Sequence, residues 1–201
     1  MKKLGSCILI ILILSKCSAQ SISIKECNAS YRNASKMIVM YSNSYNKDYL
    51  KFAINSLDTS QVCESTKAKS IKLKISIYFL LKDYKSGELF LNSLSEETFD
   101  RPYKKKMYRD IFKASQLQTL GDTVESRIIY SNLDKYMQTY LKNSITGEID
   151  KDACYAWVLI KAKYKAESII YEEIDSIKFS FPKDINFIDS LKQVLLIKDT
   201  F

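Results

Sequence analysis

Pairs of carboxylate side chains are the first residues of this chain that could do chemistry. Two carboxylates held close together can act as general acid and base, or can bind a metal ion. The pairs are Glu96 with Glu97, Glu172 with Glu173, and Asp150 with Asp152. All are expected at helix starts or on solvated helix faces, where acidic side chains complement the helix dipole. We therefore expect neither a catalytic nor a metal-binding role for them.

The residue inventory excludes most other catalytic chemistry. The 201 residues include no histidine and only four glycines. Without histidine there is no Ser-His-Asp or Cys-His catalysis and no histidine-ligated metal. The sequence also has no Walker loop, no EF-hand loop and no Gly-x-Ser-x-Gly elbow. We therefore predict that the protein is not an enzyme and uses no cofactor.

Four basic residues recur at helical spacing, and we call them the basic stripe. Arg101, Lys105, Arg109 and Lys113 are each four residues apart, so they would share one helix face. Like charges at this spacing oppose one another by roughly 0.2–0.5 kcal/mol per pair, and Asp110 relieves only part of that cost. The stripe is either an ordinary solvated face or a site for an acidic partner surface, an anionic glycan or a lipid headgroup.

The N-terminal segment has the order of a secretory signal peptide. Lys2 and Lys3 precede an uncharged stretch from Leu4 to Leu14, and small residues follow as far as Ala19. The apolar stretch is too short to span a bilayer. Residues 1–19 are therefore predicted to be a signal peptide, removed by cleavage after Ala19. The remaining residues 20–201 would form a single helical-repeat domain.

A lipoprotein signal is the alternative interpretation of the same segment. Leu14-Ser15-Lys16-Cys17 resembles a bacterial lipobox, in which Cys17 would be acylated and become the mature N-terminus. Lys16 stands where the lipobox has Gly, Ala or Ser, so cleavage after Ala19 is the preferred prediction. The first route predicts a periplasmic or secreted protein, and the second predicts one anchored at Cys17.

Charge and hydropathy then limit the partners. Removing residues 1–19 takes away three of the 31 Lys and Arg residues and none of the 23 Asp and Glu residues, which leaves a net charge of +5. This basicity is modest, and no zinc-finger spacing or RNA-binding aromatic motif accompanies it, so nucleic acid is not an expected partner. No second long apolar segment follows, so no transmembrane segment is expected in the mature chain.

The mature chain has the periodicity of consecutive amphipathic helices, which predicts an all-α fold. Residues 71–77 alternate apolar and polar side chains, as a strand does, but the same segment also forms two helical stripes. No second strand pattern could pair with it, so a helix packed on two sides is expected there. The predicted helix pairs cover about residues 27–57, 60–95, 101–142 and 150–180, and a final helix covers about 184–198.

The helix pairs show an internal repeat. Lys47-Asp48-Tyr49 recurs 35 residues later as Lys82-Asp83-Tyr84, and the Ile-Ile-Tyr of residues 128–130 recurs 41 residues later. Periods of this length built from paired helices indicate a solenoid. We expect the repeated tyrosines Tyr130 and Tyr171, together with Trp157, to pack in its core, while other aromatic rings line a recognition groove.

These repeats resemble the tetratricopeptide-repeat class. The resemblance rests on the Lys-Asp-Tyr helix entries, the turn Leu120-Gly121-Asp122, and small residues at Ala53, Gly87 and Ser126 on the second helices. It covers about residues 27–180. The resemblance implies a right-handed solenoid of about four helix pairs plus a C-terminal helix. It also implies a concave face, made largely by the first helices, that binds peptides or partner proteins.

Three cysteines remain after processing, an odd number for an oxidising compartment. Cys27 and Cys63 lie at nearly equivalent positions, near the starts of the first helices of adjacent repeats. Neighbouring helices pack with axes about 8–10 Å apart, and a disulfide needs Cα atoms within about 7 Å. Either these two cysteines form a disulfide, or all three are buried thiols. Cys154 has no matching partner and is expected to be a small buried hydrophobe.

These observations predict an exported, non-enzymatic helical-repeat scaffold. It would bind a protein or peptide partner in the cell envelope or outside the cell. The alternative is an envelope accessory protein that binds an anionic glycan or lipid headgroup through the basic stripe. A hydrolase that uses carboxylates alone is the third class.

Overall fold

The computed structural model describes residues 22–143, 149–179 and 181–196, and every regular element within them is a helix. The predicted signal peptide, with Cys17, lies outside the described residues. The α-helices are α1 (Ile24–Ser44), α2 (Lys47–Ser60), α3 (Glu64–Leu81), α4 (Tyr84–Asn92), α5 (Pro102–Thr119), α6 (Thr123–Asn143), α7 (Lys151–Ala162), α8 (Glu167–Lys178) and α9 (Ile185–Leu196), with short 3₁₀ helices η1 (Glu96–Thr98) and η2 (Pro182–Asp184). The all-α prediction is confirmed over this part of the chain.

Local residues determine where several helices begin and end. The side chains of Asn46, Asp83 and Asp150 each accept a hydrogen bond from a backbone N–H in the first turn of the helix that follows. This satisfies donors that a helix start would otherwise leave unpaired. Helices α1 and α3 end at Tyr45 and Lys82, whose φ values of 56° and 57° are left-handed. The chain therefore turns back sharply after each of these helices, which places α2 beside α1 and α4 beside α3.

Helix α3 explains the alternating pattern of residues 71–77. Ile77 packs with α1 and α2 in one hydrophobic cluster. Ile71 and Ile75 pack with α4 and α5 in another. A helix that is covered on two sides needs two apolar stripes, and two stripes on one helix produce the apparent alternation. The expectation of a helix packed on two sides is confirmed.

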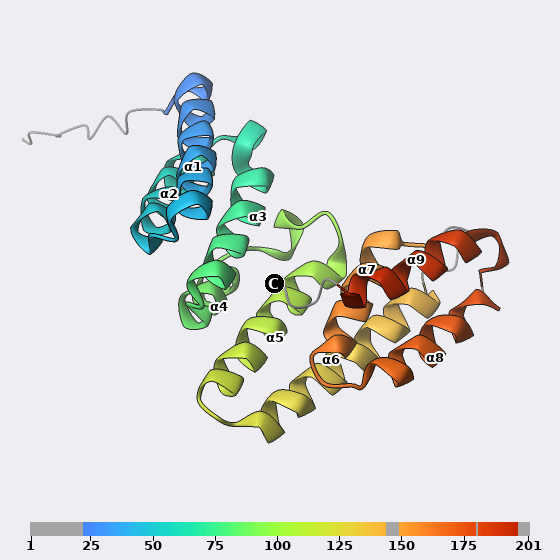
Figure 1. The fold of residues 1–201 in the computed structure, drawn as a ribbon. Helices are drawn as coiled ribbons and strands as arrows, with labels where there is room; N and C mark the ends of the chain where they lie inside the picture. The colour runs from blue at the N-terminus through green and yellow to red at the C-terminus, as the bar shows by residue number, and fades with distance from the viewer. Residues whose placement is uncertain (1–21, 144–148, 180, 197–201) are drawn as a thin grey trace, which may run out of the picture.

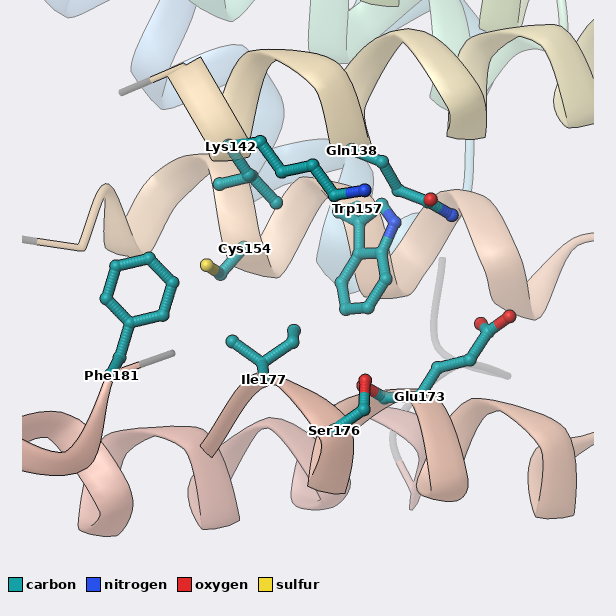
Figure 2. A pocket seen from close by; sticks show the side chains of 9 residues that line it. Gln138, Lys142, Cys154, Trp157, Glu173, Ser176, Ile177 and Phe181 are labelled. Carbon is teal, nitrogen blue, oxygen red and sulfur yellow. The ribbon is translucent and has the colours of Figure 1, made fainter. Parts of the chain in front are cut away.

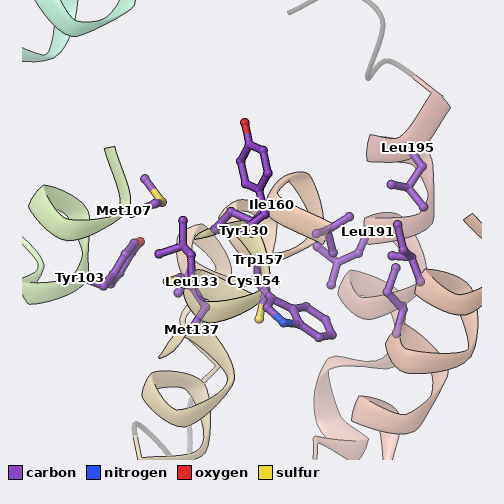
Figure 3. Packing of buried hydrophobic residues seen from close by; sticks show 14 of the residues in the cluster. Tyr103, Met107, Tyr130, Leu133, Met137, Cys154, Trp157, Ile160, Leu191 and Leu195 are labelled. Carbon is purple, nitrogen blue, oxygen red and sulfur yellow. The ribbon is translucent and has the colours of Figure 1, made fainter. Parts of the chain in front are cut away.

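Helices that follow one another in the sequence pack against each other, and Figure 1 shows α1–α4 at one end of the molecule and α6–α9 at the other. Helix α9 packs on both α7 and α8. The largest hydrophobic cluster contains residues of each helix from α5 through α9 (Figure 3). Among the helices described, none is both long enough and apolar enough to span a bilayer.

The two Ile-Ile-Tyr segments do not pack alike. In α6 the buried residue is Tyr130, whereas in α8 it is Ile170, and Tyr171 lies half-buried at the edge of the core. The residue that faces the core has thus moved by one position, which is about 100° around the helix. The helices have different neighbours, because α6 packs between α5 and α7 while α8 packs against α7 and α9. Tyr130 and Trp157 are buried as expected, but Tyr171 is not fully in the core.

Gly87 allows α4 to approach α5 closely. A Cβ atom at Gly87 would lie 2.5 Å from the ring of Phe112. That ring is fully buried and stacks on Phe79 of α3 with centroids 4.1 Å apart, so it has little room to move. Gly87→Ala should therefore lower the free energy of unfolding by about 1–3 kcal/mol, although alanine is the better helix former.

Urea unfolding measures this effect. Lys85→Ala, an exposed position on the same helix, is the control and should change stability by less than about 0.5 kcal/mol. A Gly87→Ala variant as stable as the wild type would contradict the close contact with Phe112.

Candidate binding site between α6, α7 and α8

A carboxylate is buried where α6 and α7 meet. Asp134 of α6 is only 2% exposed. Its Oδ1 accepts hydrogen bonds from Nε1 of Trp157 at 2.7 Å and from the amide of Gln138 at 2.9 Å. Its Oδ2 accepts from Nζ of Lys161 at 2.8 Å and from the hydroxyl of Tyr164 at 2.5 Å. Both oxygens are therefore satisfied within the protein, as a buried carboxylate requires.

Two lysines and two carboxylates form one ion cluster here. Lys161 is fully buried, and its Nζ forms an ion pair with Oε2 of Glu173 on α8 at 2.6 Å. Lys165 donates to Oε1 of Glu173 at 2.6 Å and lies 3.5 Å from Oδ2 of Asp134. The charges sum to zero, which is the usual condition for burying ions. The cluster links α6, α7 and α8.

Burial and hydrogen bonding act in opposite directions on these groups. Burial alone would raise the pKa of Asp134, but hydrogen bonds from Lys161, Tyr164 and Gln138 outweigh it and lower that pKa. Burial lowers the pKa of Lys161, and its contacts with Asp134 and Glu173 offset only part of this effect. Burial also raises the pKa of Tyr164, with Asp134 adding to the shift. Tyr164 therefore stays a neutral O–H donor to the ionised Asp134.

A pocket of about 260 Å³ opens beside the ion cluster (Figure 2). One face of Trp157 forms part of its wall, while the indole N–H is held by Asp134. The ion cluster therefore fixes the position of the largest ring in the pocket. Five apolar or weakly polar side chains and four polar ones line it: Leu141, Cys154, Trp157, Ile177 and Phe181, with Gln138, Lys142, Glu173 and Ser176.

Lys142 is the exposed cation of this pocket. Figure 2 shows its side chain reaching across the α6 side of the pocket, with the amino group above Trp157. Among the described residues, none forms an ion pair with Lys142, whereas Lys161 and Lys165 are both paired with carboxylates. The amino group of Lys142 is therefore available to an anion that enters the pocket.

The basic stripe lies on α5 and at its start, where folding brings acidic groups to it. Nε of Arg101 is 3.7 Å from Asp150, which precedes α7. Nζ of Lys105 is 3.5 Å from Glu96 of η1, donates to the backbone oxygen of Leu94, and is part of a side chain only 13% exposed. These two stripe residues therefore serve contacts within the protein.

Three of the four stripe residues are accessible and only Lys105 is mostly covered, since the Arg101 side chain is also 54% exposed. Arg109 is 41% exposed at its side chain and lies 3.4 Å from Asp110. Lys113 is exposed and has no ion pair with any residue that the structure describes. A continuous row of four accessible cations is therefore not present, and none of the four lines the pocket.

At least one member of each acidic pair makes a contact within the protein. Glu173 belongs to the ion cluster, Glu96 contacts Lys105, and Asp150 caps α7. Within the described ranges, no group of three or more Asp, Glu or Cys side chains is placed to hold a metal ion.

Cys27 and Cys63 form a disulfide with Cα atoms 6.2 Å apart. Cys27 lies in the first turn of α1, and Cys63 immediately precedes α3. The bond therefore joins the starts of the first helices of two adjacent pairs, which is the arrangement that the repeat register predicts for it. Cys154 is a buried free thiol on α7.

The Cys154 thiol should be unreactive in the folded protein. It is 1% exposed, and burial, with Asp150 and Asp184 contributing, raises its pKa to about 12. The thiolate is the reactive form of cysteine, so alkylation by iodoacetamide at pH 8 should be at least about 100-fold slower than in urea. Mass spectrometry of time points measures both rates. A folded-state rate close to that in urea would mean that the pocket opens widely to solvent.

Comparison with known proteins gives no relative: no family model, no curated protein and no solved structure matches this chain.

Proposed function

We propose that the protein is an exported, non-enzymatic helical-repeat scaffold that binds a protein or peptide partner through the pocket between α6, α7 and α8. The observation that carries this proposal is a pre-formed apolar pocket whose tryptophan is fixed by a buried ion cluster. Its volume of about 260 Å³ is below the roughly 300–1,000 Å³ of pockets for drug-sized ligands. It suits one large apolar side chain of a partner, which is how energetically dominant residues bind at interfaces.

The proposed architecture is a right-handed solenoid similar to the tetratricopeptide-repeat class. Consecutive helices that pack in pairs support it, as do the buried small residues Ala53, Gly87 and Ser126 on α2, α4 and α6. Small residues at one position of successive second helices permit close helix packing. The C-terminal group of α7, α8 and α9 would end the array, and the pocket lies in this group and against α6.

Two features support export. The segment of residues 1–19 has the charge and hydropathy pattern of a signal peptide. The Cys27–Cys63 disulfide is a bond that persists in oxidising compartments and is rare in reducing ones.

A matched pair of substitutions on α8 tests the pocket as the binding site. Ile177→Arg places a charge in the pocket wall, whereas Ile169→Arg makes the same change at an exposed position of the same helix. The immobilised protein is exposed to an envelope extract of its source cells, and stoichiometric partners are quantified by mass spectrometry. Wild type and Ile169→Arg should retain the same partner, and Ile177→Arg should lose it at least about tenfold.

Circular dichroism of each variant shows whether its helices are intact. We expect both variants to fold, because a long arginine side chain can place its charged end in solvent. Equal retention of the partner by a folded Ile177→Arg variant would contradict the proposed site.

A further inference from the structure

Among the described residues of the pocket and the ion cluster, the positive charges exceed the negative charges by one. Asp134 and Glu173 are matched by Lys161 and Lys165 within the ion cluster. Over the part of the chain that the structure describes, Lys142 has no counterion, which leaves one positive charge on the α6 side of the pocket. A low-dielectric apolar wall beside a cation strengthens its attraction for an anion relative to bulk water. The pocket therefore favours a ligand with a single negative charge.

Both sides of the pocket carry polar and apolar side chains, with Leu141 on α6 and with Glu173 and Ser176 on α8, but the unpaired cation is on the α6 side. Lys142 and Gln138 are four residues apart on α6 and so lie on one face of that helix. Gln138 is held in place by its hydrogen bond to Asp134. Ile177 and Phe181 lie on the opposite side of the cavity, next to Cys154 (Figure 2). The Glu173 carboxylate on α8 is already paired with two lysines. A ligand with one anionic end would therefore place that end against Lys142 and its apolar body against Ile177 and Phe181.

We propose that the pocket selects an apolar group that carries one carboxylate, with the carboxylate bound by Lys142 and the apolar body packed between Trp157, Ile177 and Phe181. This inference rests on the proposed function, because it names the chemistry that the same pocket recognises. The volume of about 260 Å³ corresponds to an organic group of about ten non-hydrogen atoms at ordinary packing density. The carboxylate belongs either to a free small acid or to an acidic residue beside an apolar one in a peptide.

Trp157 provides a direct measurement of binding. It is the only tryptophan in the chain, and it lines the pocket, so the intrinsic fluorescence reports on occupancy. The purified protein is titrated with cyclohexylacetate and with its neutral isostere, cyclohexylacetamide. We expect the acid to bind about five- to tenfold more tightly at low salt, the range for a partly exposed ion pair with a charged hydrogen bond.

Three variants test whether Lys142 is the cause. Lys142→Gln should abolish the preference for the acid, and Lys142→Arg should keep it. Lys135→Gln is the matched control: it removes the same charge from an exposed position of the same helix, outside the pocket lining. It should keep the preference. A second pair of probes, acetyl-Gly-Leu-Asp-Gly-amide and its Asn counterpart, distinguishes the two origins of the carboxylate. Tighter binding of the Asp peptide indicates that the carboxylate belongs to a peptide. Equal binding of the two peptides, with cyclohexylacetate still preferred over cyclohexylacetamide, indicates a free acid.

Equal binding of cyclohexylacetate and cyclohexylacetamide to the wild type would overturn this inference and leave the proposed apolar site standing. Equal loss of the preference in Lys135→Gln and Lys142→Gln would also overturn it, because the effect would then be one of overall charge. The absence of a fluorescence response to both cyclohexylacetate and cyclohexylacetamide would also overturn this inference. The comparison of Ile177→Arg with Ile169→Arg tests the proposed function independently.

Discussion

Asp134→Ala should lower the free energy of unfolding by about 3–5 kcal/mol, the cost of breaking a buried ion pair by removing one partner. Lys161 would remain fully buried with only Glu173 as a counterion. The hydroxyl of Tyr164 and the indole N–H of Trp157 would also lose their acceptor. Unpaired buried donors carry a desolvation cost of their own, so the effect should lie toward the upper end of this range.

Urea unfolding followed by Trp157 fluorescence measures the loss. Asp152→Ala is the control, because its carboxylate is 74% exposed and lies 3.9 Å from Lys104, and exposed pairs contribute at most about 1 kcal/mol. The double variant Asp134→Leu with Lys161→Met replaces the pair by apolar groups and should recover part of the stability. A double variant as unstable as the sum of the two single variants would contradict the coupling between these residues.

Removing the Cys27–Cys63 bond should lower the free energy of unfolding by about 3–4 kcal/mol in the chain-entropy model. The two cysteines are 36 positions apart, so the bond restricts a long loop of the unfolded chain. The double variant Cys27→Ser with Cys63→Ser is compared with the wild type in urea, and the wild type is also measured with and without a reductant.

Reductant should destabilise the wild type and leave the double variant unchanged, because Cys154 has no disulfide to lose. If the wild type were equally stable with and without reductant, the bond would not contribute to the folded state. Peptide mapping without reduction identifies the linked pair directly.

The positions of the helices could be predicted from the sequence, because apolar periodicity determines which face of each helix is buried. The predicted pair at residues 27–57 corresponds to α1 and α2, and the segment at 71–77 is helical in α3. The proximity of Cys27 and Cys63 could also be predicted, because equivalent residues of adjacent helix pairs lie at similar positions along the helix axes. These inferences use only spacing within one helix or between neighbouring pairs.

The candidate site could not be predicted in the same way. Its residues come from three helices, and their meeting depends on how those helices pack. A signal was present in α6, where Asp134 lies among Tyr130, Leu133 and Met137 on a buried face. A charged residue on an apolar face requires a buried partner, but the sequence does not show that this partner is Lys161. The acidic contacts of the basic stripe were not predictable for a related reason, since Asp150 and Glu96 reach Arg101 and Lys105 from other elements.

The division of the core into three clusters has a consequence for how the molecule opens. The cluster that joins α5 to α9 is much larger than the one that holds α1 and α2 to α3. Local opening requires less free energy where fewer apolar side chains are buried. Backbone amides of α1 and α2 should therefore exchange their hydrogens with solvent through partial openings that leave α6 and α7 protected, and unfolding of the whole chain need not be a single cooperative step. The disulfide is located in the part of the molecule with the smaller core, where a covalent link most reduces such openings.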